Sequence, residues 1–327
     1  MLITRRISSG VVALVGIVLL VSVFANNLFA IGPAFDDLTD GFRPHMTDEA
    51  LEALQADLGL LGQIPEEFEA LAPQLTGALE MEPAQFDGFV GEQFPDVANS
   101  LAALPEIVLN FSGLIQTLAD QQDNFSRADA IPTDFLPATT IPWGLTVIGF
   151  LFVGLGAFMY QGNVRLGAKL TIGLGVAVIL GSAILSLTGK SGDADDMNEA
   201  LKPIYTTETV QGGIQALGVV GNMGNQMQNE MLPGVGEQLQ MSPEDVGAFI
   251  GEASPTISRA LQVMPDAMER FQGLLGAFDT NLDNYDTLRP VSLSPIIWSL
   301  LIASVIAVFA AGAVLVLEWR DAVAQLE

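Results

Sequence analysis

The segment Met81–Pro95 reads MEPAQFDGFVGEQFP, and the segment Met241–Pro255 reads MSPEDVGAFIGEASP. The likeness extends beyond these two segments, because residues 73–125 align without a gap to residues 233–285 at an offset of 160. Further toward the N-terminus the matches continue at an offset of 159. An internal repeat of this kind indicates a duplicated structural unit.

The composition indicates what kind of unit is duplicated. Apolar residues make up 50% of the 327 residues and charged residues only 15%, and the apolar residues are clustered. Four clusters are each close to the ~20 residues that a helix needs to cross the hydrocarbon core of a membrane. No charged residue lies in their central turns. The chain is therefore predicted to have four transmembrane helices.

The distribution of charge predicts the orientation of these spans. Basic residues flank the spans on one side, whereas residues 32–140 and 188–294 together hold seven basic and thirty-five acidic residues, a net charge of −28. Because cytoplasmic loops carry the excess of Lys and Arg, both termini are predicted to be cytoplasmic. So acidic an exterior repels nucleic acid, which is excluded as a partner. The predicted segments are the cytoplasmic N-terminus 1–9, span 10–31, extracytoplasmic helical domain 32–140, span 141–160, cytoplasmic loop 161–165, span 166–187, extracytoplasmic helical domain 188–294, span 295–319 and cytoplasmic C-terminus 320–327.

The first span also has features of a cleavable signal peptide. Arg5 and Arg6 precede an apolar core, and the small-residue patterns at 23–25 and 28–30 are typical of cleavage sites. The length of the apolar run and its counterpart elsewhere in the chain favour a retained span. The composition, with nine Arg, three Lys and abundant Ala, Gly and Val, is typical of a bacterial gene with a high GC content.

The repeat combines a span, an exterior domain and a second span in each copy. Each copy crosses the membrane twice, so the two copies have the same orientation and a pseudo-twofold axis along the membrane normal is predicted. The exterior segments follow a helical pattern, with apolar residues three or four apart in 48–61 and an N-cap signal at Thr47 that recurs at Thr206. Prolines are expected to start new helices at positions 65, 83, 95, 105, 233, 243, 255 and 265. The predicted fold is all-α.

Small residues on the spans predict close helix packing. Such residues allow helix backbones to approach each other in lipid, either within this bundle or against another membrane subunit. The residues concerned are Gly149, Gly154, Gly173, Gly175, Ala303, Ala307 and Ala311.

Acidic residues recur just outside the first and third spans and form an acidic collar. Asp36 and Asp37 in the first copy match Asp195 and Asp196 in the second. A solvated surface is the simpler interpretation, and a divalent cation site is the alternative. No other metal site is expected, because the chain has no Cys and a single His, His45.

A methionine stripe distinguishes the second copy. Met223, Met227 and Met231 lie four residues apart in a segment otherwise rich in Gly, Asn and Gln. Soft methionine side chains suit a core, an apolar ligand or a partner surface. Core packing is the usual interpretation of such a stripe, but the polar surroundings point to a ligand or partner surface, which is the prediction for these three residues.

No cofactor motif and no nucleophile–base pair is present in the sequence, so we expect a non-enzymatic protein without a cofactor. The main hypothesis is a scaffold or accessory subunit of a cell-envelope complex in the bacterial inner membrane, with membrane lipids and another integral membrane protein or a second copy as partners. The alternative is a binder or carrier of lipid-like hydrophobic molecules at the outer face of the membrane. An unbranched apolar tunnel would favour the alternative, and an exposed flat apolar patch would favour the scaffold.

Overall fold

The computed structural model describes residues 2–133 and 135–324. Helices account for 88% of the chain, and no β-strand forms within these described residues. The all-α prediction is confirmed. The helices belong to two units, each of which combines segments that are distant in the sequence.

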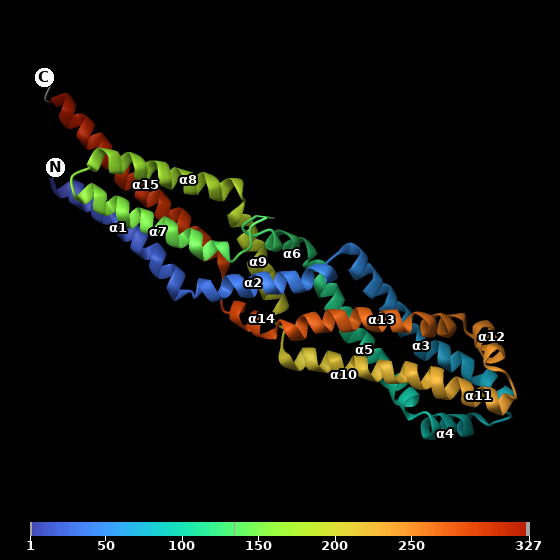
Figure 1. Cartoon of the computed structure of the whole chain (residues 1–327). Helices are drawn as coiled ribbons and strands as arrows, with labels where there is room; N and C mark the ends of the chain where they lie inside the picture. The colour runs from blue at the N-terminus through green and yellow to red at the C-terminus, as the bar shows by residue number, and fades with distance from the viewer. Residues whose placement is uncertain (1, 134, 325–327) are drawn as a thin grey trace. The chain divides into compact units, whose positions relative to one another are not determined.

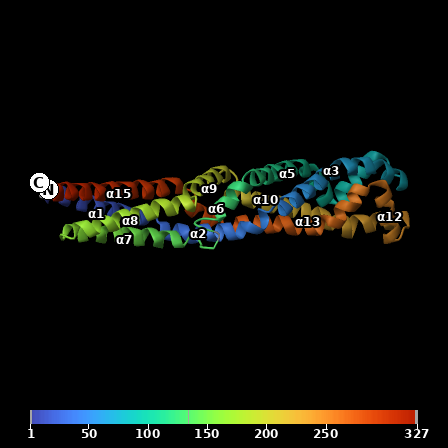
Figure 2. The ribbon, with the colours of Figure 1, turned by 90° about the horizontal axis from the view of Figure 1, so that it is seen from above.

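Unit 1 comprises residues 1–40, 123–202 and 283–327, and its main part is a bundle of four long apolar helices. These are α1 (Leu2–Ala25), α7 (Thr140–Tyr160), α8 (Val164–Ile184) and α15 (Leu293–Ala324). Helix α1 packs against both α7 and α15, and α8 packs against both α15 and α7. Figures 1 and 2 show these helices side by side from two directions.

Shorter helices continue this bundle at the end opposite the two termini. They are α2 (Leu28–Phe42), α6 (Gln122–Asp129), α9 (Leu187–Leu201) and α14 (Leu282–Leu288), and α9 packs against both α8 and α15. Helix α1 is separated from α2 at Asn27, and α8 is separated from α9 at Ser186, with φ angles of 51° and 52°. This left-handed conformation cannot continue a right-handed helix, so each helix changes direction there.

Unit 2 comprises residues 41–122 and 203–282 and contains a second four-helix bundle. Its long helices are α3 (Asp48–Ala78), α5 (Pro95–Asp120), α10 (Thr207–Gln226) and α13 (Pro255–Thr280). Helix α3 packs against α5 and α13, and α10 packs against the same two helices. The sequence predicted one helical domain in each of the segments 32–140 and 188–294. The structure groups them differently, because helices from both segments share one core.

Short elements connect the long helices of unit 2. A 3-10 turn, η1 (Arg43–His45), precedes α3, and α4 (Pro83–Gln93) links α3 to α5. A π-helical turn, η2 (Met227–Met231), follows α10 and leads through α11 (Leu232–Leu239) to α12 (Pro243–Ala253).

The helix starts follow the local signals in the sequence only in part. The side chains of Thr47 and Thr206 accept hydrogen bonds from the amides of Ala50 and Thr209, as expected of N-caps. Four helices begin at a predicted proline, namely α4, α5, α12 and α13. The prediction is wrong at Pro65, Pro105 and Pro265, which lie inside α3, α5 and α13. Packing along the whole length of each helix offsets the hydrogen bond that each proline removes.

Among the described residues, five helices are long and apolar enough to cross a membrane, as expected of a membrane protein. Four of them are the long helices of unit 1, near the four predicted spans. The fifth is α5 in unit 2, which has the lowest mean hydropathy of the five, 1.4.

Candidate functional site

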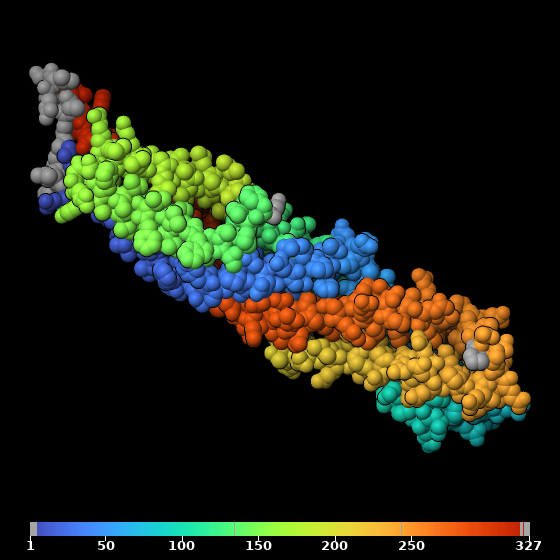
Figure 3. Space-filling model, viewed as in Figure 1, coloured from blue at the N-terminus to red at the C-terminus, as the bar shows by residue number. Residues whose placement is uncertain are grey.

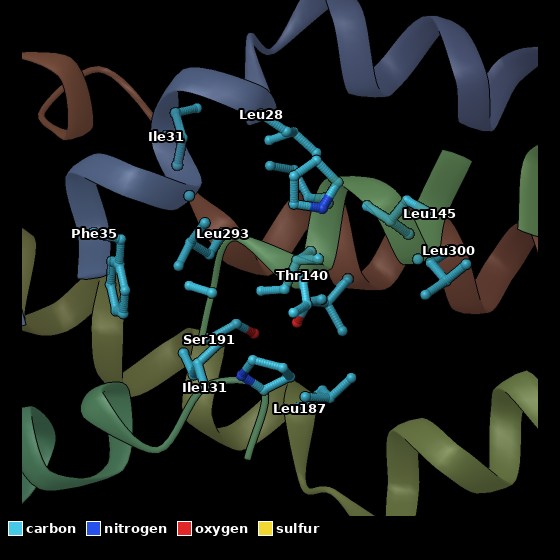
Figure 4. A pocket seen from close by; sticks show the side chains of 18 of the residues that line it. Leu28, Ile31, Phe35, Ile131, Thr140, Leu145, Leu187, Ser191, Leu293 and Leu300 are labelled. Atoms are coloured by element: carbon cyan, nitrogen blue, oxygen red, sulfur yellow. The ribbon is translucent and has the colours of Figure 1, made fainter. Parts of the chain in front are cut away.

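The clearest candidate site is an apolar cavity in unit 1, near the breaks between α1 and α2 and between α8 and α9. Its volume is about 340 Å³. Its walls come from α2, the α6–α7 connection, the start of α7, the start of α9 and the start of α15. Figure 4 shows side chains from these elements around a common space. They include Leu28, Ile31, Phe35, Ile131, Leu145, Leu187, Leu293 and Leu300.

The wall of the cavity offers little to a polar ligand. No Asp, Glu, Lys, Arg or His is among the described residues that line it. The hydroxyl of Thr140 donates to the carbonyl of Pro137 at 2.7 Å, and that of Ser191 donates to the carbonyl of Thr188 at 3.2 Å. Because these hydroxyl protons are already used by nearby backbone carbonyls, the lining suits apolar groups.

The α6–α7 connection forms one wall and is held in place by hydrogen bonds from two sides. The carboxylate of Asp36 accepts from the amides of Ala138, at 2.7 Å, and Thr139, at 3.0 Å. The ammonium of Lys190 donates to the carbonyl of Ala130 at 2.6 Å. Charged hydrogen bonds of this kind are stronger than neutral ones, so the connection is well fixed beside the cavity.

The acidic collar therefore includes a structural feature that the sequence interpretation missed. Asp36 accepts from the amides of Ala138 and Thr139, the two residues just before α7, and Asp195 accepts from the amides of Leu293, at 2.7 Å, and Ser294, at 2.9 Å, the first two residues of α15. Asp37 and Asp196 are exposed. Both carboxylates thus lie close to a helix N-terminus, where negative charge is stabilised. This role replaces both the solvated surface and the cation site for these two residues.

The methionine stripe lies in the core of unit 2, contrary to the prediction of a ligand or partner surface. Met223, Met227 and Met231 are each at most 3% exposed. Met227 and Met231 adjoin apolar residues of α3, including Phe68 and Leu71. The prediction failed because the exposed polar residues Asn222, Asn225, Gln228 and Asn229 occupy the other faces of α10 and η2, while the stripe faces the rest of the bundle.

Most of the predicted small residues lie at contacts within unit 1. A side chain on Gly149 would overlap Leu20 of α1, and one on Gly175 would overlap Val308 of α15. Ala303, Ala307 and Ala311 are also buried. Gly154 and Gly173 are different, because both are exposed and an added Cβ atom would meet no atom within 4 Å. The small residues therefore fall into two groups. Internal packing involves Gly149, Gly175, Ala303, Ala307 and Ala311, whereas Gly154 and Gly173 lie on an open surface.

Burial shifts the pKa of two side chains outside the cavity. In unit 2, burial lowers the pKa of His45. In unit 1, burial raises the pKa of Tyr285 to about 12, and its hydroxyl donates to the carbonyl of Asn198 at 3.0 Å. Desolvation disfavours the charged form in each case. Both groups are neutral near pH 7, and neither lines the cavity.

No family model matches the chain, and no curated protein or solved structure is significantly similar to it. Any function must therefore follow from the chemistry of the site itself.

The cavity was not predicted from the sequence, although one signal for it exists. The connection from Phe125 to Trp143 is longer than the matching connection from Tyr285 to Trp298. The longer connection supplies Ile131 and several other lining residues. The extra length of this connection is thus a sequence signal for the wall that it adds to the cavity.

Proposed function

We propose that this protein binds or carries lipid-like apolar molecules, and that the cavity of unit 1 is the binding site. The observation that carries the proposal is an apolar cavity of about 340 Å³ whose two hydroxyl groups already donate to backbone carbonyls. Small-molecule pockets typically begin at about 300 Å³ and are lined mainly by apolar side chains. The proposal assigns no covalent chemistry and no cofactor to the protein.

We place the site at the outer face of a bacterial inner membrane, crossed by α1, α7, α8 and α15. Aromatic residues support this placement: Trp298 and Trp319 of α15 are 54% and 65% exposed. Their separation along the helix is about 31 Å at 1.5 Å per residue, close to the thickness of the hydrocarbon core. Trp143 is also exposed near the cavity, and tryptophans of this kind mark membrane interfaces. The charge distribution supports cytoplasmic termini.

We assign α5 to unit 2 outside the membrane, although its composition permits a span. Two of its backbone amides, those of Asp96 and Val97, donate to the side-chain oxygen of Gln226 at 2.9 and 3.1 Å. The hydroxyl of Ser100 donates to the carbonyl of Val219. These bonds attach α5 to α10, which is too polar to be a candidate span.

We further propose that the chain is a tandem repeat with pseudo-twofold symmetry. All four non-glycine residues with positive φ among the described residues support this proposal. They form two pairs at the offsets of the repeat: Asn27 with Ser186, at 159, and Glu80 with Gln240, at 160. The helix caps of Asp36 and Asp195 form a further pair at an offset of 159. Rare backbone conformations at matching positions are typical of two copies of one ancestral structure.

Saturable binding of an apolar chain tests the proposed function. The purified protein, delipidated in mild detergent, is titrated with a brominated fatty acid, and adducts are counted by native mass spectrometry. We expect one saturable adduct per chain, together with co-purified lipid in the untreated protein. Adducts that grow linearly with concentration, without saturation, would contradict the proposal.

A scaffold or accessory subunit of a cell-envelope complex is the second candidate function. An open groove of about 640 Å³ between α5 and α10 in unit 2 favours it, together with Leu109, which is 71% exposed. If the groove binds another membrane protein, Leu109→Asp should reduce recovery of that protein and leave the stability of unit 2 unchanged. Leu109→Met is the matched control. Equal recovery with both variants would argue against the groove as a docking site.

A further inference from the structure

We infer that the cavity is open to the lipid phase beside Gly144 and holds one hydrocarbon chain of a neutral or zwitterionic membrane lipid, whose headgroup stays at the interface. This inference rests on the proposed function and adds the route and the class of ligand. The route would be lateral, from the bilayer, and not from the aqueous phase.

The position of Gly144 provides the opening. Gly144 lies in the first turns of α7, lines the cavity and is exposed at the surface. A Cβ atom added there would meet no atom within 4 Å, so open space lies beside the backbone. In the space-filling view a hollow separates α7 from the end of α8, and α15 is visible at its floor (Figure 3). The neighbouring Trp143 is 64% exposed, which places this opening at the level of the membrane interface.

Close backbone contacts close two other routes, one between α2 and the α6–α7 connection and one between α1 and α7. A side chain on Gly32 of α2 would lie 2.9 Å from the Cα atom of Thr139, so α2 lies directly against the α6–α7 connection. A side chain on Gly16 of α1 would overlap the carbonyl oxygen of Gly149 in α7. These contacts leave no space for a chain between α2 and the connection or between α1 and α7, so the side at Gly144 is the route that the structure favours.

The chemistry of the wall determines the class of ligand. A chain that leaves the bilayer gains little from the hydrophobic effect, because lipid tails are as apolar as the cavity wall. It gains dispersion contacts instead, since an apolar space without an occupant leaves the atoms of its wall without partners on one side. A charged headgroup has no partner among the lining residues and stays outside. The acidic excess of the proposed exterior disfavours anionic headgroups.

The substitution Gly144→Leu tests this route directly, because it adds a side chain into space that is open in the structure. The protein is reconstituted in nanodiscs that contain phosphatidylethanolamine with a photoactivatable diazirine near the end of one chain. Crosslinked peptides are then mapped by mass spectrometry. In the unmodified protein we expect crosslinks at the cavity residues Ile131 and Leu300, which are both 5% exposed, as well as at the lipid-facing Phe150.

Gly144→Leu should reduce the crosslinks at Ile131 and Leu300 relative to Phe150 by about fivefold or more, the change expected when added methylenes compete for an occupied space. Gly154→Leu is the matched control, because Gly154 is an equally open glycine of α7 that does not line the cavity. It should leave the ratio unchanged. Gly144→Ala should have an intermediate effect, and thermal unfolding of each variant checks that the fold is retained.

The outcomes separate this inference from the proposed function. Crosslinks at Ile131 and Leu300 that persist in Gly144→Leu would overturn the lateral route and leave the binding site in place. Saturable fatty-acid binding without bilayer crosslinks in the cavity would also overturn it, because the chain would then come from water. Equal or stronger crosslinking by phosphatidylglycerol with the same diazirine chain would overturn the preference for uncharged or zwitterionic headgroups. If the unmodified protein showed no saturable fatty-acid binding, the proposed function itself would be overturned.

Discussion

At the scale of single residues, two aspartates bind backbone amides where the second and fourth apolar helices of unit 1 begin. Asp36 accepts from the amides of the two residues just before α7, and Asp195 accepts from the amides of the first two residues of α15. The amides in the first turn of a helix lack partners within the helix, because no carbonyl groups precede them. A carboxylate also stabilises the positive end of the helix dipole. The two residues therefore perform the same physical task.

The first prediction follows from these caps. Asp36→Ala and Asp195→Ala should each lower the free energy of unfolding by about 0.5–2 kcal/mol, the usual cost of losing an N-cap. Asp37→Ala, at an exposed position, should change it little. Denaturant unfolding in detergent micelles provides the measurement. A chelator should have no effect on any of these proteins, whereas a chelator that destabilised only the unmodified protein would indicate a bound cation.

At the scale of helices, an ion pair joins the two halves of unit 2. Arg270 of α13 donates through Nε and Nη2 to the two carboxylate oxygens of Asp57 in α3, at 2.8 and 2.9 Å. Asp57 is buried, and the side chain of Arg270 is 37% exposed. The hydrogen bond to Asp57 is the main cause of the raised pKa of Arg270. The pair connects helices that are far apart in the sequence.

The second prediction concerns this pair. Arg270→Met should destabilise unit 2 by about 2 kcal/mol, less than for a fully buried pair because water reaches the arginine. The double variant Asp57→Leu/Arg270→Met should recover most of that loss, since no buried charge remains. Denaturant unfolding of Arg270→Met, of Asp57→Leu and of the double variant completes the thermodynamic cycle. Additive losses would mean that α3 and α13 are not coupled through this pair.

At the scale of the whole molecule, the proposed topology depends on how many of the apolar helices cross the membrane. Five helices qualify by length and composition, and the proposed topology uses only the four in unit 1. If α5 also crossed the membrane, every segment after it would lie on the side opposite to the one proposed. The choice between four and five spans therefore changes the location of residues far from α5.

The third prediction is a labelling pattern. The chain has no cysteine, so single cysteines can be introduced at the exposed residues Ala56, Gln161 and Gln215 without background. In intact spheroplasts an impermeant thiol reagent should label Ala56→Cys and Gln215→Cys but not Gln161→Cys. All three should react after permeabilisation. Labelling of Gln161→Cys with protection of Gln215→Cys would indicate that α5 spans the membrane and would contradict the four-span proposal.

Local signals in the sequence were sufficient for the helices themselves. Apolar periodicity, the caps at Thr47 and Thr206, and prolines at helix starts act within a few residues, so they can be recognised without the rest of the fold. The same locality explains the misassigned prolines. Pro65, Pro105 and Pro265 lie inside long helices because packing at a distance outweighed the local preference.

What only the tertiary structure decided is which elements meet. The grouping of α3 and α5 with α10 and α13, and the burial of the stripe at Met223, Met227 and Met231, depend on contacts between residues more than a hundred positions apart. The cavity likewise exists because the ends of several separate segments converge around it. By itself the sequence determined an all-α chain with strongly apolar helices, since those properties follow from short-range periodicity and composition. The core of unit 2 and the site in unit 1 required the folded chain, because burial and cavity shape arise from the simultaneous packing of distant helices.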